Sequence, residues 1–218
     1  MKINGLRWII LSLIMLVSII NYLDRGTLNY MWVANTKSEY PADRAVYDTA
    51  DGTYTLTAAD GTTVVAPADR VAQQADGSYV YTAVGGIAAE LGILDPAMPE
   101  AEFKAQSKKL LADITIFFMI AYGLSQLFSG KLYDRIGTRR GFAFSALLWG
   151  AADAFTAFAA GFKSLTAFRF MLGLGEAGPW PGTTKSNAEW FPTKERALAQ
   201  GLFNASTSVG SILAPIVI

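Results

Sequence analysis

The stretch that decides the fold is Gly130-Lys131-Leu132-Tyr133-Asp134-Arg135-Ile136-Gly137-Thr138-Arg139-Arg140. Its glycines permit a tight turn and a close approach of two helices. The segment before it, residues 114–130, carries no charged side chain, and the segment after it, residues 141–162, carries only Asp153. A helix needs about 20 mostly apolar residues to cross a bilayer. The stretch is therefore predicted to be a short basic loop between two membrane-spanning helices.

Three further segments are as apolar, so the sequence predicts an all-α membrane protein with five spans. We expect the spans at residues 1–34, 112–130, 141–162, 164–187 and 197–218, with loops at 131–140 and 188–196. The first span is also open to interpretation as a secretory signal, since Lys2 and Arg7 precede an apolar run. No small-residue cleavage site follows that run, which disfavours the signal.

The composition excludes several classes of function. Hydrophobic residues make up 52% of the 218 residues, charged residues only 17%, and mean hydropathy is +0.29. A soluble domain carries about a quarter charged residues. The absence of Cys and His removes thiolate ligands and the commonest general base and metal ligand. We therefore expect no enzyme activity, no catalytic residue, no metal and no cofactor, and the zero net charge argues against nucleic acid as a partner.

That zero net charge hides an asymmetry between two parts of the chain. Residues 33–113 carry 12 acidic and 6 basic side chains, a net −6, which leaves +6 for the remainder. Basic residues precede the first span and fill both predicted loops, whereas Lys163 is the only base in the turn at 161–164. Loops rich in Lys and Arg stay in the cytoplasm. The pattern places the N-terminus in the cytoplasm and residues 35–111 on the opposite side.

Residues 35–111 are a different kind of sequence. Asp-Gly pairs at 51–52, 60–61 and 76–77 are flanked by β-branched and aromatic residues, a pattern typical of β-hairpins. We expect a small unit of two to four strands, followed by a helix at 99–111 that leads into the second span. The unit is either a tolerated surface insertion or a docking or lid module, and its residues do not select a ligand.

The first and fourth predicted spans contain Asp24, Arg25, Arg169 and Glu176. An ionisable group inside a membrane is costly and usually faces a polar interior. Arg169 and Glu176 are seven residues apart and so share one helix face, while Asp24 and Arg25 are adjacent. An arginine suits an anionic substrate, and a buried carboxyl can gain and lose a proton. The alternative is a structural ion-pair network. Asp153 is alone in its span, and we expect it to have a structural role.

Several uncharged polar residues on the spans are candidates for the same cavity, although such groups also serve helix packing. They are Tyr22, Tyr122, Gln126, Asn204 and Ser208. The fourth span is rich in Gly and Pro between 173 and 182, which suits either a helix that bends during function or close static packing.

Several motifs together resemble one family. The loop at 130–140 resembles the signature loop of the major facilitator superfamily. Other stretches resemble its anion:cation symporter family, in the branch of hexuronate and galactonate transporters, and the resemblance covers nearly all of the chain outside 35–84. These stretches are Asn21-Tyr22-Leu23-Asp24-Arg25, residues 169–178 (RFMLGLGEAG), residues 188–197 (AEWFPTKERA) and residues 203–206 (FNAS).

The resemblance implies a fold of twelve helices in two halves. This chain would be the first five of them, with a small extracytoplasmic β-rich insert between the first and second, and the missing C-terminal half would supply the other wall of the cavity. It also implies a bacterial inner-membrane symporter that imports a sugar acid, such as a hexuronate or galactonate, with protons by alternating access. Besides the lipid bilayer, its partner would be that small anion, and the proton would be the coupling ion.

The resemblance further assigns roles to residues. Arg25 and Arg169 would bind the substrate carboxylate, with Tyr22, Tyr122, Gln126 and Asn204 as further cavity contacts. Asp24 and Glu176 would couple transport to protons. The gating loop would comprise Gly130, Asp134, Arg135, Gly137, Arg139 and Arg140, whose acid either caps a neighbouring helix or pairs with a base.

Two rival functions remain open from the sequence. One is transport or exchange of a different organic anion. The other is a membrane-anchored sensor or binding protein that uses the outer insert.

Overall fold

The computed structural model describes residues 5–58, 60–96 and 98–218, so Lys2 lies outside the described residues. The chain divides into two compact units. Unit 1 comprises Met1–Tyr30 and Ala112–Ile218, and unit 2 comprises Met31–Leu111.

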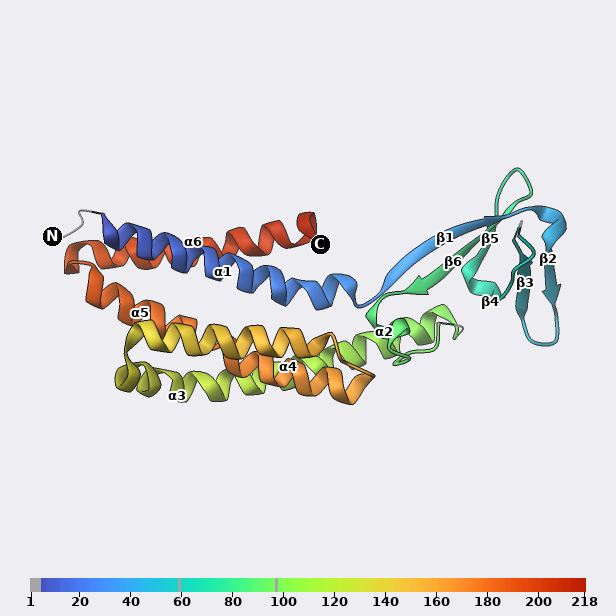
Figure 1. Ribbon diagram of the computed structural model, residues 1–218. Helices are drawn as coiled ribbons and strands as arrows, with labels where there is room; N and C mark the ends of the chain where they lie inside the picture. Colours follow the sequence, from blue (N-terminus) through green and yellow to red (C-terminus); the bar gives the residue numbers. More distant parts are fainter. Residues whose placement is uncertain (1–4, 59, 97) are drawn as a thin grey trace. The chain divides into compact units, whose positions relative to one another are not determined.

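Unit 1 is helical (Figure 1). Its helices are α1 (Leu6–Met31), the part of α3 (Glu100–Thr156) from Ala112 onward, α4 (Phe162–Glu176), α5 (Pro179–Trp190) and α6 (Thr193–Val217). Among the described residues, α1 and α3 are long and apolar enough to cross a membrane. The expectation of five spans stays a prediction.

Helix α3 contains the predicted basic loop, and it reverses direction there (Figure 1). Gly137 has φ 81° and ψ 161°, outside the helical region, whereas the residues on both sides remain helical. A positive φ is open to glycine because it has no Cβ. The reversal is thus tighter than the expected loop of ten residues. The two halves of α3 form an antiparallel helical hairpin around it.

The predicted fourth span, residues 164–187, is interrupted. Helix α4 ends at Glu176 and α5 begins at Pro179, a proline at the first helical position. Proline has no N–H to donate to the preceding turn. The interruption therefore follows from Pro179 and lies directly after the buried Glu176.

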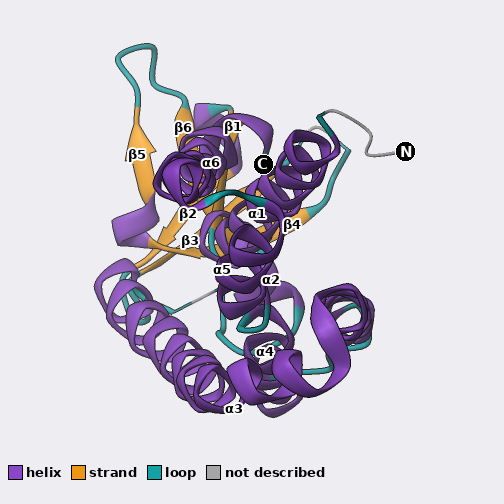
Figure 2. Cartoon of the chain, turned by 90° about the vertical axis from the view of Figure 1, so that its left-hand side faces the viewer, coloured by secondary structure: helices purple, strands orange, loops and turns teal. Residues whose placement is uncertain are grey.

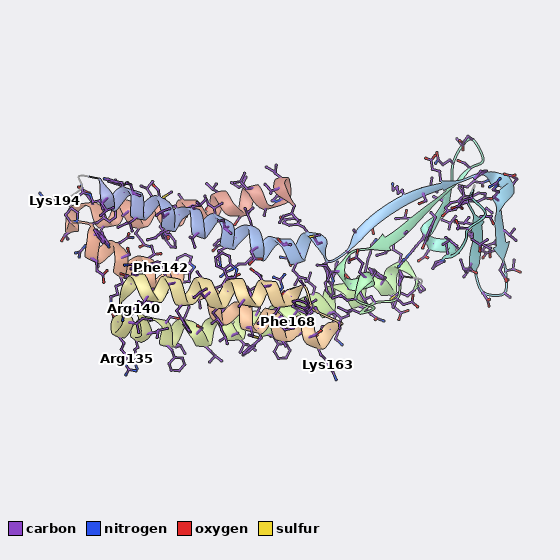
Figure 3. All side chains as sticks on the ribbon, in the orientation of Figure 1. Arg135, Arg140, Phe142, Lys163, Phe168 and Lys194 are labelled. Carbon is purple, nitrogen blue, oxygen red and sulfur yellow. The ribbon has the colours of Figure 1, made fainter. Side chains whose placement is uncertain are left out.

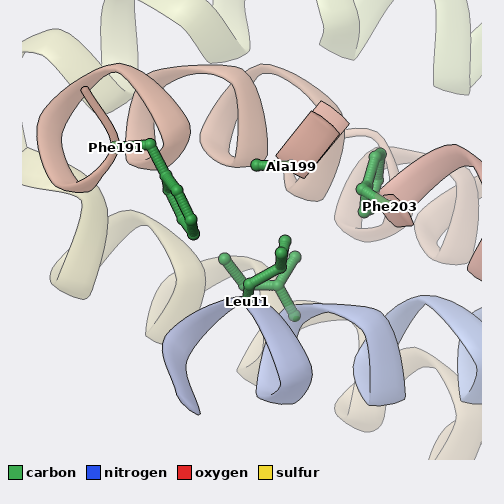
Figure 4. Close-up of a cluster of buried hydrophobic side chains, with 5 residues drawn as sticks. Leu11, Phe191, Ala199 and Phe203 are labelled. Carbon is green, nitrogen blue, oxygen red and sulfur yellow. The ribbon is translucent and has the colours of Figure 1, made fainter. Parts of the chain in front are cut away.

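Helices α1 and α6 pack together through a core of buried apolar side chains near the N-terminal end of α1 (Figure 4). Its members are Leu11, Ile14, Phe191, Ala199 and Phe203. Trp180 of α5 meets Phe203 edge-on, with ring centroids 5.1 Å apart. Aromatic pairs of this geometry add about 0.5–1.5 kcal/mol to their area burial. This core fixes α1 against the C-terminal helices.

In the described part of the chain, strands occur only in unit 2 (orange in Figure 2). They are β1 (Ala34–Tyr40), β2 (Ala45–Asp48), β3 (Thr53–Thr57), β4 (Thr63–Pro67), β5 (Val71–Gln73) and β6 (Tyr79–Gly85), with 3₁₀ turns η1 (Ala42–Arg44) and η2 (Ala68–Arg70) and a short helix α2 (Ile87–Glu90). They form two antiparallel sheets, ordered β1-β6-β5 and β2-β3-β4. The expectation of two to four strands was wrong, since the described residues contain six.

The three Asp-Gly pairs lie at turns between paired strands, as predicted. Gly52, Gly61 and Gly77 have φ of 64°, 85° and 87°. Asp60 Oδ1 accepts hydrogen bonds from the backbone N–H and the hydroxyl of Thr62, and Asp76 Oδ1 accepts the same pair from Ser78. These local bonds explain why the sequence specifies the turns.

Unit 2 is built from two copies of one pattern. Residues 41–57 and residues 67–82 each run from Pro-Ala-Asp-Arg through a strand and an Asp-Gly turn into a second strand. The hairpin of the first copy pairs with β4, the strand just before the second copy, through β3. The hairpin of the second copy pairs with β1, the strand just before the first copy, through β6. The registers match, since Tyr54 faces Ala66 and Tyr79 faces Tyr40. The two copies therefore exchange a strand, and this exchange closes a core of Tyr40, Leu56, Ala66 and Tyr81.

The predicted helix at 99–111 is present as the start of α3, at Glu100. Asp69 Oδ2 accepts a hydrogen bond of 2.6 Å from the backbone N–H of Glu100. An acid beside the first turn satisfies an otherwise unpaired donor and favours the helix dipole. This bond therefore joins η2 to the start of α3 within unit 2.

Candidate functional site

The centre of the candidate site is an ion pair between α1 and α4. Arg25 Nε lies 2.5 Å from Glu176 Oε2, and the Glu176 side chain is 0% exposed. The guanidinium of Arg25 also lies over the ring of Tyr122, 4.6 Å from its centroid. Such contacts hold a cation in an apolar setting. Two of the four intramembrane charges are therefore direct partners.

The other charges gather beside this pair. Trp149 Nε1 donates a hydrogen bond of 2.6 Å to Asp24 Oδ2, and the carboxyl of Asp153 lies beside that of Asp24. The second half of α3 thus supplies Asp24 with a donor and a carboxyl partner.

Sequence reasoning missed this contribution from α3. Asp153 is not an isolated structural residue, since it meets Asp24 and is also close to Arg169. The signal that could have found it is its spacing: Trp149 and Asp153 are four residues apart, so they share one helix face.

Arg169 completes the cluster. It is 7% exposed and lines a cavity of about 100 Å³ together with Arg25. The other lining residues are Leu28, Asn29, Ile114, Thr115, Phe118 and Met119. Arg169 Nε and Arg25 Nη2 are buried and have no hydrogen-bond partner among the described residues. A buried N–H of a charged group without an acceptor is costly, so the cavity suits an anion.

The uncharged candidates divide into two groups. The Tyr122 side chain lies beside Arg25 and Gln126, and the Tyr22 ring lies 5.3 Å from the Arg25 guanidinium. Asn21, which the sequence singled out only as part of a motif, lies beside Glu176, and its side-chain nitrogen is buried without a hydrogen-bond partner among the described residues. The structure therefore brings Tyr22, Tyr122 and Gln126 to the cluster.

Asn204 and Ser208 do not join it. Both lie on the exposed face of α6, and Asn204 Oδ1 accepts a hydrogen bond of 3.4 Å from Gln200. Within the described ranges, no contact links either residue to Arg25 or Glu176.

Glycines bring α4 close enough for these contacts. A Cβ on Gly173 would lie 2.5 Å from the carbonyl oxygen of Phe118, and one on Gly175 would lie 2.6 Å from the backbone nitrogen of Trp149. Both neighbours are backbone atoms of α3 and cannot turn aside. The glycine-rich fourth segment therefore sets the distance between α4 and both halves of α3.

The signature loop is held by a different ion pair. Lys185 Nζ of α5 lies 2.8 Å from Asp134 Oδ1 and donates a hydrogen bond of 2.9 Å to the carbonyl oxygen of Tyr133. The sequence left two roles open for Asp134, the cap of a neighbouring helix or the partner of a base. In the structure Asp134 pairs with a base, Lys185. Gly130 has open space around its Cβ position, and the loop arginines are exposed. These arginines are Arg135, Arg139 and Arg140.

The sequence profile of the Major Facilitator Superfamily matches residues 76–218. The chain belongs to this superfamily. Membership means that the helices of unit 1 belong to a major facilitator fold. Proteins of this superfamily are multi-pass membrane proteins. This agrees with the resemblance carried by the loop at 130–140.

Curated relatives within the superfamily carry related names. The chain is 39% identical to the "Galacturonate transporter" of Dickeya chrysanthemi and 38% identical to the "Hexuronate transporter" of Escherichia coli K12, each over 98 residues. It is 34% identical to the "Probable L-galactonate transporter" of Escherichia coli K12. Each alignment covers 45% of this chain but 28%, 23% and 22% of the respective relatives. The matched region thus spans about a quarter of their length.

Basic residues of this major facilitator chain gather at one end of unit 1. Figure 3 shows Arg135, Arg140 and Lys194 at one end of the helices and Lys163 at the other. At the N-terminus of α1, Arg7 Nη2 lies 3.0 Å from Glu195 Oε2 of α6. The ends of the helical unit therefore differ in charge.

Proposed function

We propose that the protein acts in a proton-coupled transporter that imports a sugar acid by alternating access. The observation that carries the proposal is the pair of arginines, Arg25 and Arg169, which line one cavity and each have a buried nitrogen without a partner among the described residues. The names of the relatives, which are transporters of galacturonate, hexuronate and galactonate, support the class of substrate.

The two arginines bind the substrate carboxylate. A guanidinium has two parallel N–H groups that match a carboxylate, and it keeps its charge at any physiological pH. Tyr122 and Gln126, which lie side by side, offer a hydroxyl and an amide to the sugar hydroxyls. Tyr22 and Asn204 act as further contacts, Asn204 from the exposed face of α6 when that face meets the rest of the cavity.

Proton coupling follows from competition for Arg25. In the structure Arg25 pairs with Glu176, and a substrate carboxylate that binds Arg25 displaces this partner. A buried carboxylate that loses its partner is costly, so Glu176 takes up a proton as the substrate enters. Asp24, whose carboxyl lies beside that of Asp153, is the second coupling acid. The proton and the anion then enter the cell together.

The remaining features fit an N-terminus in the cytoplasm of a bacterial inner membrane. The basic end of unit 1, with its Asp134–Lys185 pair, lies on the cytoplasmic side and gates the cavity there. Five helices of a twelve-helix fold come from this chain, unit 2 lies in the periplasm, and the second half of the transporter closes the cavity. Alternating access is the rocking of the two halves around this site.

Uptake of labelled sugar acids tests the proposal. In cells that produce the whole protein from its own gene, we expect an inward proton gradient to drive accumulation of galacturonate, glucuronate or galactonate, but not of neutral galactose. Arg169→Gln should raise the KM at least tenfold, whereas Arg7→Gln, at a surface ion pair, should leave it within twofold.

Two results would change the proposal. Equal uptake of galactose and galacturonate would refute a carboxylate-selective site. Uptake that persists without a proton gradient but requires an internal anion would identify an exchanger instead of a symporter.

A further inference from the structure

Unit 2 contains a pocket of about 220 Å³ that the transport mechanism does not use. It lies where η2 and β5 meet β6 and the first turn of α3. Its lining includes Asn35, Asp69, Arg70, Thr82, Phe103 and Lys104. All of these residues belong to unit 2.

Arg70 is the unusual residue of this pocket. It is 4% exposed, its Nη1 donates a hydrogen bond to the carbonyl oxygen of Pro96, and its guanidinium lies 5.1 Å from the ring centroid of Phe103. Arg70 Nε and Nη2 are buried and have no hydrogen-bond partner among the described residues. A buried charged donor that is left without an acceptor destabilises the fold. These two nitrogens form one edge of the guanidinium, which is the edge that binds a carboxylate through two parallel bonds.

The other charges around the pocket already have partners. Glu100 forms an ion pair with Lys104, and Asp69 accepts the backbone N–H of Glu100. The hydrogen bond and charge of Lys104, with a smaller contribution from Arg70, hold the pKa of the Glu100 carboxyl below its ordinary value. The pair is therefore ionised and neutral overall, so the unfilled hydrogen-bonding capacity belongs to Arg70.

The internal repeat supplies a natural comparison. Arg44 occupies the position in the first copy that Arg70 occupies in the second. Arg44 Nη1 donates a hydrogen bond of 2.8 Å to the carbonyl oxygen of Ala58, and the residue is only half-buried. Both arginines thus bond a backbone carbonyl, as the shared pattern requires. Only Arg70 has in addition a buried pair of unpartnered nitrogens, so this feature is not demanded by the fold of the repeat.

We propose that this pocket binds a small hydroxylated carboxylic acid, with the carboxylate on Arg70 Nε and Nη2. The start of α3 adds the partial positive charge of a helix N-terminus. Asn35, Thr82 and Asp69 line the pocket with side chains that can hydrogen-bond hydroxyls, and Phe103 adds an apolar wall. The choice of a sugar acid among such ligands rests on the proposed function. The pocket is then a second site for the cargo, outside the membrane helices.

Hydrogen–deuterium exchange of the full chain in detergent micelles tests this assignment, because it reports each segment separately. We expect galacturonate to slow exchange in residues 67–73 and 99–105. Galactose, which lacks a carboxylate, and acetate, which lacks hydroxyls, should do so only at concentrations at least tenfold higher. Arg70→Gln and Arg70→Lys should each raise the half-saturating galacturonate concentration at least tenfold, whereas the matched Arg44→Gln should change it less than twofold.

The segments distinguish this proposal from the transport proposal. Protection by galacturonate in unit 1 alone would refute the pocket and leave the transport site standing. Protection in residues 67–73 and 99–105 of a protein that takes up no sugar acid would support the pocket and refute the transport proposal. If Arg70→Gln raises exchange throughout β5 and β6 without ligand, the wild-type comparison of galacturonate, galactose and acetate decides alone, and equal protection by all three would overturn the proposal.

Discussion

At the residue scale, the cluster around Arg25 shows which contacts the sequence specifies. The placement of Asp24, Arg25, Arg169 and Glu176 in apolar segments predicted a shared polar site, because a charge in a membrane seeks a partner. The spacing of Trp149 and Asp153 places both on one helix face, but the meeting of that face with Asp24 depends on how α1 packs against the far half of α3. Asn204 lies on the exposed face of α6 and bonds Gln200, so its role as a cavity contact stays a prediction.

Tyr122 offers a test of single contacts. Tyr122→Phe removes a hydroxyl that is placed to hydrogen-bond Arg25 and Gln126 but keeps the ring beside the guanidinium. A hydrogen bond of this kind is worth about 0.5–1.5 kcal/mol, so we expect the KM for galacturonate uptake to rise about two- to tenfold. Tyr122→Ala should raise it further because the ring is lost too. The control is Tyr30→Phe, at an exposed position of α1, and an equal effect of both Phe variants would contradict the role of Tyr122.

At the scale of elements, the sequence predicted turns that depend on neighbouring residues, but it did not predict the pairing of strands that are far apart in the chain. Each Asp-Gly turn is specified within a few residues, so all three were predicted. The exchange of strands between the two copies in unit 2 requires pairing of β1 with β6, segments far apart in the chain, and no short pattern encodes it. The break between α4 and α5 has a local cause, Pro179. The prediction of one continuous span did not take this proline into account.

The glycines of α4 give the first prediction at this scale. Gly173→Ala and Gly175→Ala each place a Cβ against backbone atoms of α3. Overpacking of this kind costs about 1–3 kcal/mol, so both variants should melt at lower temperature than the wild type in detergent. Gly150→Ala in α3, where the added Cβ meets open space, is the matched control and should melt at the same or a higher temperature. Unchanged melting of the α4 variants would show that α4 does not pack closely on α3.

The turns of unit 2 give a prediction about pH. Hydrogen bonds from Thr62 and Ser78 hold the pKa of the Asp60 and Asp76 carboxyls below their ordinary value. Because the folded pKa is the lower one, each carboxylate stabilises its turn above the ordinary pKa, about 3.9, and loses this effect as the pH falls through the folded pKa. Carboxyl titration by NMR should show both midpoints below that value, and Ser78→Ala should raise the Asp76 midpoint while leaving Asp60 unchanged. A midpoint of Asp76 that ignores this substitution would contradict the bond.

At the scale of the whole molecule, the distribution of charge predicted more than the total did. A net charge of zero divides into an acidic segment at 33–113 and a basic remainder. That segment coincides closely with unit 2, Met31–Leu111. The division could be predicted because membrane topology sorts Lys and Arg by side. The number of spans could not be settled this way, since only α1 and α3 meet the length and hydropathy expected of a span among the described residues.

Orientation in the membrane is open to a clean test because the chain contains no Cys. Single substitutions Asp51→Cys, Ala160→Cys and Thr193→Cys place a thiol at exposed positions in unit 2, before α4 and at the start of α6. A membrane-impermeant maleimide should label the first two in intact spheroplasts, and the third only after permeabilisation. Labelling of Thr193→Cys in intact spheroplasts would reverse the proposed orientation.

The central claim is that a buried carboxyl beside the arginines couples the anion to a proton. The most direct measurement is accumulation of labelled galacturonate under an imposed inward proton gradient, comparing Glu176→Gln with the matched Glu195→Gln at the surface pair with Arg7. The account predicts that Glu195→Gln accumulates substrate as the wild type does, while Glu176→Gln equilibrates it without concentrating it or does not transport it. Gradient-driven accumulation by Glu176→Gln at the wild-type level would contradict the account.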